Sequence, residues 1–146
     1  MTIPKWKNHL NRSFILICLG LLKYVSTKLV DYHNHVSEYG IHWNFFFTMG
    51  IVQSLCGSLT SRLDRKNIML LAILLGIGHE MILQKFHYHW IFKFTTEQRF
   101  ASTIWMANIE GIISLLGFSS LYLMGSILRM DINGIIQNQD NLKSSG

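Results

Sequence analysis

Four side chains that can move protons stand just ahead of an apolar run rich in phenylalanine. They are His35, Glu38, Tyr39 and His42. If this stretch is helical, the four positions recur at i, i+3, i+4 and i+7, which places them on one face. A carboxylate between two imidazoles can take a proton from an alcohol. The spacing therefore predicts a general-base site at which Glu38 or His42 activates a hydroxyl.

The apolar run itself begins with Trp43 and Asn44, followed by the three phenylalanines 45–47. The amide of Asn44 can donate a hydrogen bond to a developing oxyanion. A simpler interpretation exists, because tryptophan, tyrosine and histidine favour the headgroup depth of a bilayer. The residue types by themselves do not distinguish a functional site from a belt of side chains at the membrane interface.

A second polar group, Asn108 and Glu110, lies inside the last apolar segment. An ionisable side chain at bilayer depth costs about 2.5–3.5 kcal/mol on insertion scales, so Glu110 needs a partner or water. Either Lys23 or Lys28 of the first apolar segment is the expected counter-ion. The alternative is a shallow, hydrated position for the carboxylate.

Two His-x-His pairs, at 33/35 and 87/89, raise the question of a metal site. Rings two residues apart point in different directions on a helix, although they align on a strand, and no cysteine accompanies the pairs. We therefore do not expect a metal site. A proton or ion pathway through Glu80, Glu110 and the histidines is a weaker hypothesis, which flux measurements in proteoliposomes would test.

The composition indicates which elements must position these groups. Charged residues make up 14% of the chain and hydrophobic residues 49%, with a mean hydropathy of +0.26. Soluble domains carry about 25% charged residues. Long apolar runs, each near the ~20 residues of a bilayer helix, predict an all-α, polytopic membrane helix bundle with about four transmembrane helices. The expected spans are 13–30, 41–59, 67–83 and 103–128.

These spans are expected to form one membrane domain over residues 1–130. The polar tail, residues 131–146, is expected to be disordered. Within the second span, Gly50, Ser54 and Ser58 recur every four residues. Small residues at this spacing allow a neighbouring membrane helix to approach closely.

The formal net charge of +5 does not point to nucleic acid, since the basic residues flank apolar runs and form no single stripe. Of the 13 Lys and Arg residues, eight flank one predicted side of the bilayer and three flank the other. The positive-inside rule then predicts cytosolic termini. It places residues 31–40 in the lumen of an endomembrane.

The segment 32–48 reads YHNHVSEYGIHWNFFFT and closely resembles the signature of the GPI-anchor inositol acyltransferase family. A second segment, ANIEGIIS at 107–114, with Gly117 after it, resembles another motif of that family in the same order. The resemblance covers about residues 19–128, and the length of the first motif makes it specific.

The resemblance implies a multi-pass protein of the endoplasmic reticulum membrane that acts in GPI-anchor biosynthesis. Such proteins move an acyl group, typically palmitoyl, from acyl-CoA to the inositol of glucosaminyl-phosphatidylinositol. The implied partners are acyl-CoA as a co-substrate and the membrane lipid as the acceptor, with no bound cofactor and no nucleic acid. Association with other transmembrane helices fits this class.

The same resemblance implies roles for the residues above. Glu38 and His42 are the candidate catalytic residues, which deprotonate or orient the inositol hydroxyl. The phenylalanines 45–47 would border the acyl chain. The candidate substrate-binding residues are His35, Tyr39, Trp43, Asn44, Asn108 and Glu110.

The chain departs from the family pattern in two respects. Ile109 stands where the second motif usually has a basic residue, which removes a partner for Glu110. Family members are also several times longer, with upstream Arg-Arg-Phe-Ala-Lys and Met-Asp-x-Gly runs that this sequence lacks. We therefore expect a fragment or truncated member of the family. The alternative function is a non-catalytic membrane module that keeps lipid binding without turnover.

Overall fold

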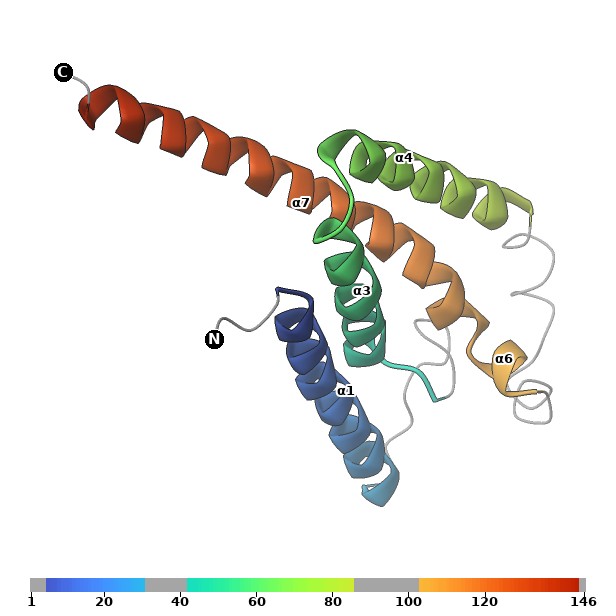
Figure 1. Cartoon of the computed structure of the whole chain (residues 1–146). Coiled ribbons are helices and arrows are strands. Elements are labelled where there is room, and N and C mark those ends of the chain that lie inside the picture. The colour runs from blue at the N-terminus through green and yellow to red at the C-terminus, as the bar shows by residue number, and fades with distance from the viewer. Residues whose placement is uncertain (1–4, 31–41, 86–102, 145–146) are drawn as a thin grey trace.

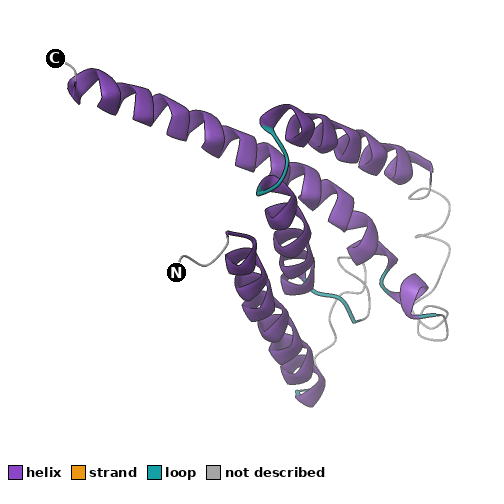
Figure 2. Cartoon of the chain, viewed as in Figure 1, coloured by secondary structure: helices purple, strands orange, loops and turns teal. Residues whose placement is uncertain are grey.

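The computed structural model describes residues 5–30, 42–85 and 103–144, and the regular elements in these ranges are helices (Figures 1 and 2). The α-helices are α1 (Lys5–Leu29), α3 (Phe45–Thr60), α4 (Arg65–Ile82), α6 (Ile104–Ala107) and α7 (Ile109–Ser144). The prediction of an all-α chain is confirmed for the described residues.

Three of the described helices are long and apolar enough to cross a membrane, by length and composition. They are Asn8–Leu29, Arg65–Lys85 and Ile109–Ser144. Helix α3 is also apolar but has 16 residues. It therefore spans about 24 Å, less than the ~30 Å hydrocarbon core. Large apolar side chains such as Phe14 and Leu74 are 68% and 57% exposed, as expected of a surface that faces lipid. The predicted membrane helix bundle is confirmed.

Asn44 determines where α3 begins. Its backbone is extended, with φ −148° and ψ 166°, and its Oδ1 accepts hydrogen bonds from the backbone N–H groups of Phe46 and Phe47. An asparagine at this position satisfies amides that the first turn of a helix otherwise leaves without partners. The helix therefore occupies Phe45–Thr60, later than the start at residue 41 that hydropathy predicts.

Helices α1 and α3 lie side by side and run antiparallel (Figure 1). A Cβ atom on Gly20 of α1 would lie 2.9 Å from the ring of Phe47, near the start of α3. A Cβ on Gly57, near the end of α3, would lie 2.5 Å from Nδ1 of His9. Gly50 meets α1 between these two points, as the small-residue pattern predicts. Glycines at these contacts let the two backbones approach closely.

Helices α4 and α7 also pack antiparallel (Figure 1). Oγ of Ser120 donates to the backbone oxygen of Ala72 at 2.8 Å, beside Gly76, where a Cβ would lie 3.0 Å from that hydroxyl. Further along, Nε and Nη2 of Arg65 donate to the two carboxylate oxygens of Asp131 at 2.8 and 2.7 Å. The pair is solvent-exposed, so it contributes more to register than to stability.

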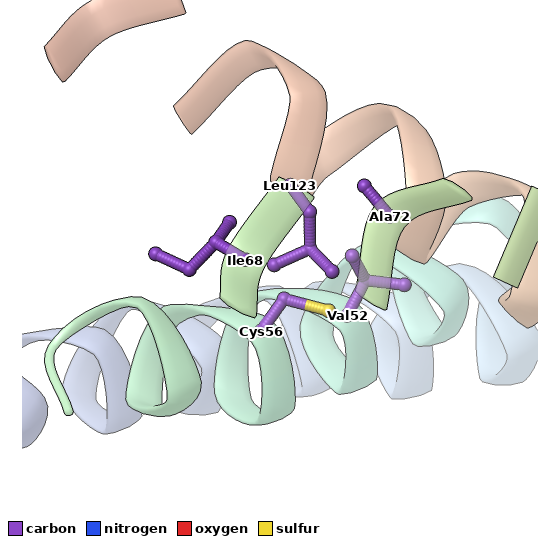
Figure 3. Packing of buried hydrophobic residues seen from close by; sticks show 5 residues of the cluster. All are labelled: Val52, Cys56, Ile68, Ala72 and Leu123. Atoms are coloured by element: carbon purple, nitrogen blue, oxygen red, sulfur yellow. The ribbon is translucent and has the colours of Figure 1, made fainter. Parts of the chain in front are cut away.

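Apolar side chains from three helices form a buried core cluster (Figure 3). Val52 and Cys56 come from α3, Ile68 and Ala72 from α4, and Leu123 from α7, and each is at most 2% exposed. Since α1 packs on α3 and α4 packs on α7, this cluster joins the two helix pairs into one bundle.

The last predicted span, 103–128, is interrupted. Helix α6 ends at Ala107 and α7 begins at Ile109, with Asn108 between them at φ −126° and ψ 23°, outside helical geometry. Non-helical backbone at membrane depth is tolerated only where it is buried in protein or lines a water-filled cavity. The break therefore needs partners from elsewhere in the chain.

Helix α7 continues to Ser144 (Figure 2), so residues 131–144 are helical where the composition predicts a disordered tail. Their side chains are mostly exposed. Adding turns to an existing helix avoids the cost of nucleation, which explains how a polar segment continues the helix. The ion pair between Asp131 and Arg65 holds the first of these turns against α4.

Candidate functional site

The two polar groups predicted from the sequence meet in the structure through one hydrogen bond. The backbone N–H of His42 donates to Oδ1 of Asn108, 2.8 Å away, across 66 residues of sequence. His42 precedes α3, and Asn108 occupies the break between α6 and α7. The bond therefore joins the start of one apolar helix to the discontinuity in another.

Asn108 uses its amide to support the backbone. The residue is 5% exposed. Its Nδ2 donates to the carbonyl of Ile104 at 2.8 Å, and its own backbone oxygen accepts from the N–H of Ile112 at 3.1 Å. Asn108 thus ends α6, begins α7 and holds His42 at the same time.

His42 has a second anchor on its ring. Oη of Tyr24, on α1, lies 3.3 Å from Nδ1 of His42, and the two rings meet edge to face with centroids 5.8 Å apart. Nζ of Lys28 lies 5.7 Å from the centroid of the Tyr24 ring, which is within the range of a cation–π contact. Within the described part of the chain, Nε2 of His42 has no hydrogen-bond partner. Among the described residues, Nε2 is therefore the ring nitrogen that is left open for chemistry.

Trp43 packs its indole directly on the glycine of the second motif. A Cβ on Gly111 would lie 2.3 Å from Cδ1 of Trp43, so a side chain fits there only if the ring moves. The indole N–H donates to Oγ1 of Thr48 at 2.8 Å, and Thr48 is fully buried. The indole also meets the ring of Phe47 edge-on, with centroids 6.2 Å apart. Trp43 therefore connects the first motif to α7 by packing.

Asn44 ties α3 to α1. Besides capping α3, its Nδ2 donates to the carbonyl oxygen of Gly20 at 2.9 Å, and the residue is 7% exposed. The amide that the sequence predicts as an oxyanion donor already uses its oxygen and one N–H within the chain. Its observed role is to fix the spacing of two helices beside His42.

Three of the predicted site residues, His35, Glu38 and Tyr39, lie outside the described residues. The two His-x-His pairs also fall outside them. Among the residues that the structure does describe, no group of three His, Cys, Asp or Glu side chains is arranged to hold a metal ion.

Glu110 lies in the first turn of α7, next to Gly111, and is partly buried. A carboxylate at this position is stabilised by the positive end of the helix dipole. Lys23 is exposed and Lys28 lies over the ring of Tyr24. An ion pair between Glu110 and either lysine, as the sequence suggests, is not found among the described residues.

His79 and Glu80, neighbours on α4, lie in different environments. The ring of His79 packs on Gly117, and its Nδ1 lies 3.1 Å from the carbonyl oxygen of Ile113. Glu80 is exposed and accepts a hydrogen bond from Gln84 at 3.0 Å. His79 therefore takes part in the packing of α4 on α7.

Sequence reasoning missed three contributors to the site. Thr48 and Gly111 belong to the two motifs, so motif membership is the signal that would have identified them. Tyr24 stands within the first apolar span, and nothing in its neighbourhood marks it. Only its contact with His42 assigns it to the site.

Comparison with known proteins matches residues 1–144 to the family model described as GWT1. The GPI-anchored wall transfer protein 1 of Candida albicans is 36% identical over 129 residues, which cover 82% of this chain and 26% of that protein. The protein of the same name from Schizosaccharomyces pombe is 35% identical over 125 residues, with coverage of 82% and 25%. That of Yarrowia lipolytica is 30% identical over 129 residues, with coverage of 84% and 25%. The chain therefore spans about a quarter of the length of these relatives.

Proposed function

We propose the function of this chain from one premise, which is that the chain belongs to the GWT1 family. The proposal is that it forms part of a membrane acyltransferase, which moves a palmitoyl-type acyl group from acyl-CoA to the inositol of glucosaminyl-phosphatidylinositol. One observation carries it. The two motifs that resemble GPI-anchor inositol acyltransferases are joined by the hydrogen bond from His42 to Asn108.

The reaction requires a hydroxyl oxygen to attack a thioester carbonyl carbon. The inositol oxygen forms the new C–O bond and the C–S bond of acyl-CoA breaks. The hydroxyl proton passes through a base to the CoA thiolate, so the products are an ester and free CoA. We assign Glu38 or His42 to deprotonate or orient that hydroxyl. The proposal needs acyl-CoA as a co-substrate and no bound cofactor.

We propose four residues for substrate binding, of which Trp43 and Glu110 lie close to the break at Asn108. The candidates are His35, Tyr39, Trp43 and Glu110. Asn44 and Asn108 are buried, and both use their amides inside the chain. We infer that these two asparagines shape the site and do not hold the lipid head group.

We propose that the site faces the lumen of the endoplasmic reticulum and that both termini are cytosolic. The contacts of His42 with Tyr24 and Asn108 lie where α1 ends and α7 begins. Arg12 lies in the first third of α1, and Arg129 lies in the middle of α7, so both are well separated along their helices from the contacts of His42. Lys28 lies beside the site, over the ring of Tyr24, so the support for this orientation is the count of basic residues that flank the apolar runs.

Complementation tests the proposal. We expect this chain, expressed in cells that lack inositol acylation, to restore acylated glucosaminyl-phosphatidylinositol in extracted lipids, measured by mass spectrometry. Asn108→Ala removes the acceptor that holds His42, so we expect it to abolish the product. Asn138→Ala changes an exposed asparagine on α7 and is the matched control. If a well-expressed membrane protein yields no acylated lipid, the chain does not carry out the reaction by itself.

A second candidate function is a non-catalytic membrane module that binds lipid without turnover. One observation favours it. The motif asparagines Asn44 and Asn108 support the backbone, and a protein that has lost catalysis still needs this structural role. Purification in a mild detergent discriminates the two functions. Bound glycolipid or acyl-CoA without turnover favours the module, whereas the absence of both lipids counts against either function.

A further inference from the structure

His42 is held at two atoms, by a residue of α1 and by the residue in the break between α6 and α7. Its backbone N–H donates to Asn108, and its Nδ1 lies 3.3 Å from Oη of Tyr24. The Tyr24 ring meets the imidazole at an interplanar angle of 77° and lies under Nζ of Lys28, 5.7 Å from the ring centroid. The break before α7 therefore fixes the backbone of His42, and Tyr24 on α1 sets the orientation of its imidazole.

The direction of the hydrogen bond between Tyr24 and His42 decides where the imidazole proton sits. A neutral imidazole has one N–H donor and one acceptor nitrogen, and a phenol can donate or accept. The acceptor nitrogen of an imidazole is more basic than a phenol oxygen, and a phenol O–H is a good donor. The pairing in which Tyr24 donates to Nδ1 is therefore the stronger one. It leaves the proton of His42 on Nε2.

We propose that Tyr24 is a positioning residue that holds His42 in the Nε2–H tautomer, so that His42 presents a hydrogen-bond donor to a negatively charged oxygen of the substrate. This inference rests on the proposed function and narrows it. A protonated Nε2 does not take the proton of the inositol hydroxyl, which leaves Glu38 as the candidate base. The phosphate of the lipid and the oxyanion formed during acyl transfer both supply such an oxygen.

The tautomer is read directly from long-range proton–nitrogen correlation spectra of the chain, labelled at its histidine nitrogens and held in detergent micelles above neutral pH. His42→Gln identifies the His42 signals by their loss. We expect wild-type His42 in the Nε2–H form. Tyr24→Phe keeps the ring and removes the hydroxyl, so we expect the ratio of Nε2–H to Nδ1–H to fall about fivefold, the effect of one hydrogen bond.

Tyr122→Phe is the matched control, because Tyr122 lies on α7 against the core cluster and not at His42. We expect it to leave the His42 signals unchanged. Backbone amide spectra report whether each variant keeps the fold, and the wild-type spectrum tests the tautomer without any substitution. A wild-type His42 in the Nδ1–H form, or a wild-type ratio in Tyr24→Phe, overturns the inference.

Failure of this inference is distinguishable from failure of the proposed function, because the tautomer is measured without substrate. If the chain does not acylate inositol but His42 shows an Nε2–H tautomer that depends on Tyr24, the proposed function is refuted and the positioning role of Tyr24 is supported. Where acylation is measured, His42→Gln retains an N–H donor and we expect it to keep more activity than His42→Ala. Equal loss in both variants refutes the donor role. A raised KM for the lipid assigns the donor to the phosphate, and a lowered kcat assigns it to the oxyanion.

Discussion

Gly111→Ala tests the packing that brings the two motifs together. The added Cβ would lie 2.3, 2.4 and 2.7 Å from Cδ1, Cγ and Nε1 of Trp43. Ordinary carbon contacts are near ~3.5–4.0 Å, so the indole has to move by about 1 Å or more. That movement also disturbs the hydrogen bond from the indole to Thr48.

The expected loss follows from three contributions. Overpacking a tight site costs about 1–3 kcal/mol. Weakening the partly buried hydrogen bond to Thr48 adds about 0.5–1.5 kcal/mol. Alanine in a helix is favoured over glycine by about 1 kcal/mol, which offsets part of the cost. We therefore expect Gly111→Ala to lower the free energy of unfolding by about 1–3 kcal/mol.

Gly125→Ala on the same helix is the matched control, since a Cβ there would meet nothing within 4 Å. Both variants are unfolded in mild micelles by titration with a denaturing detergent, and the helix content is followed by circular dichroism. We expect Gly125→Ala to be neutral or more stable by up to about 1 kcal/mol. If Gly111→Ala is as stable as Gly125→Ala, the indole of Trp43 does not pack tightly on Gly111.

Three further substitutions test other contacts of the bundle. Asn44→Ala removes the cap of α3 and the bond to α1, so the same titration is expected to show a loss of about 1–3 kcal/mol. An unchanged midpoint in the detergent titration would show that Asn44 does not hold α3 against α1. Ser120→Ala removes one hydrogen bond between α7 and α4, and because such bonds average about 0.6 kcal/mol in membranes, the loss should stay below about 1 kcal/mol. A loss of several kcal/mol would mean that more than this bond is broken. Asp131→Asn breaks the exposed pair with Arg65, and we expect little change in overall stability but faster hydrogen exchange in the turns of α7 that follow. Identical exchange would show that the pair does not hold that segment.

Hydropathy and the two motifs by themselves determined where the helices lie in the sequence and which residues belong to the candidate site. A bilayer demands about 20 apolar residues per helix and internal hydrogen bonds for the backbone, so apolar runs alone locate the helices. The two motifs placed His42, Trp43 and Asn108 in one candidate site. The helix boundaries were less predictable, because the start of α3 depends on the extended backbone of Asn44, and the continuation of α7 depends on a helix already being present.

Only the tertiary structure decided how these parts meet. The bond from His42 to Asn108 crosses 66 residues, and nothing in the sequence around Tyr24 indicates that its hydroxyl reaches the imidazole of His42. Likewise, the amide of Asn44 is a helix cap and interhelical clamp because Gly20 approaches it closely. Hydropathy has the same value whichever helix faces which. Partner choice follows from where small residues allow backbones to approach and from which buried polar atoms must be satisfied there.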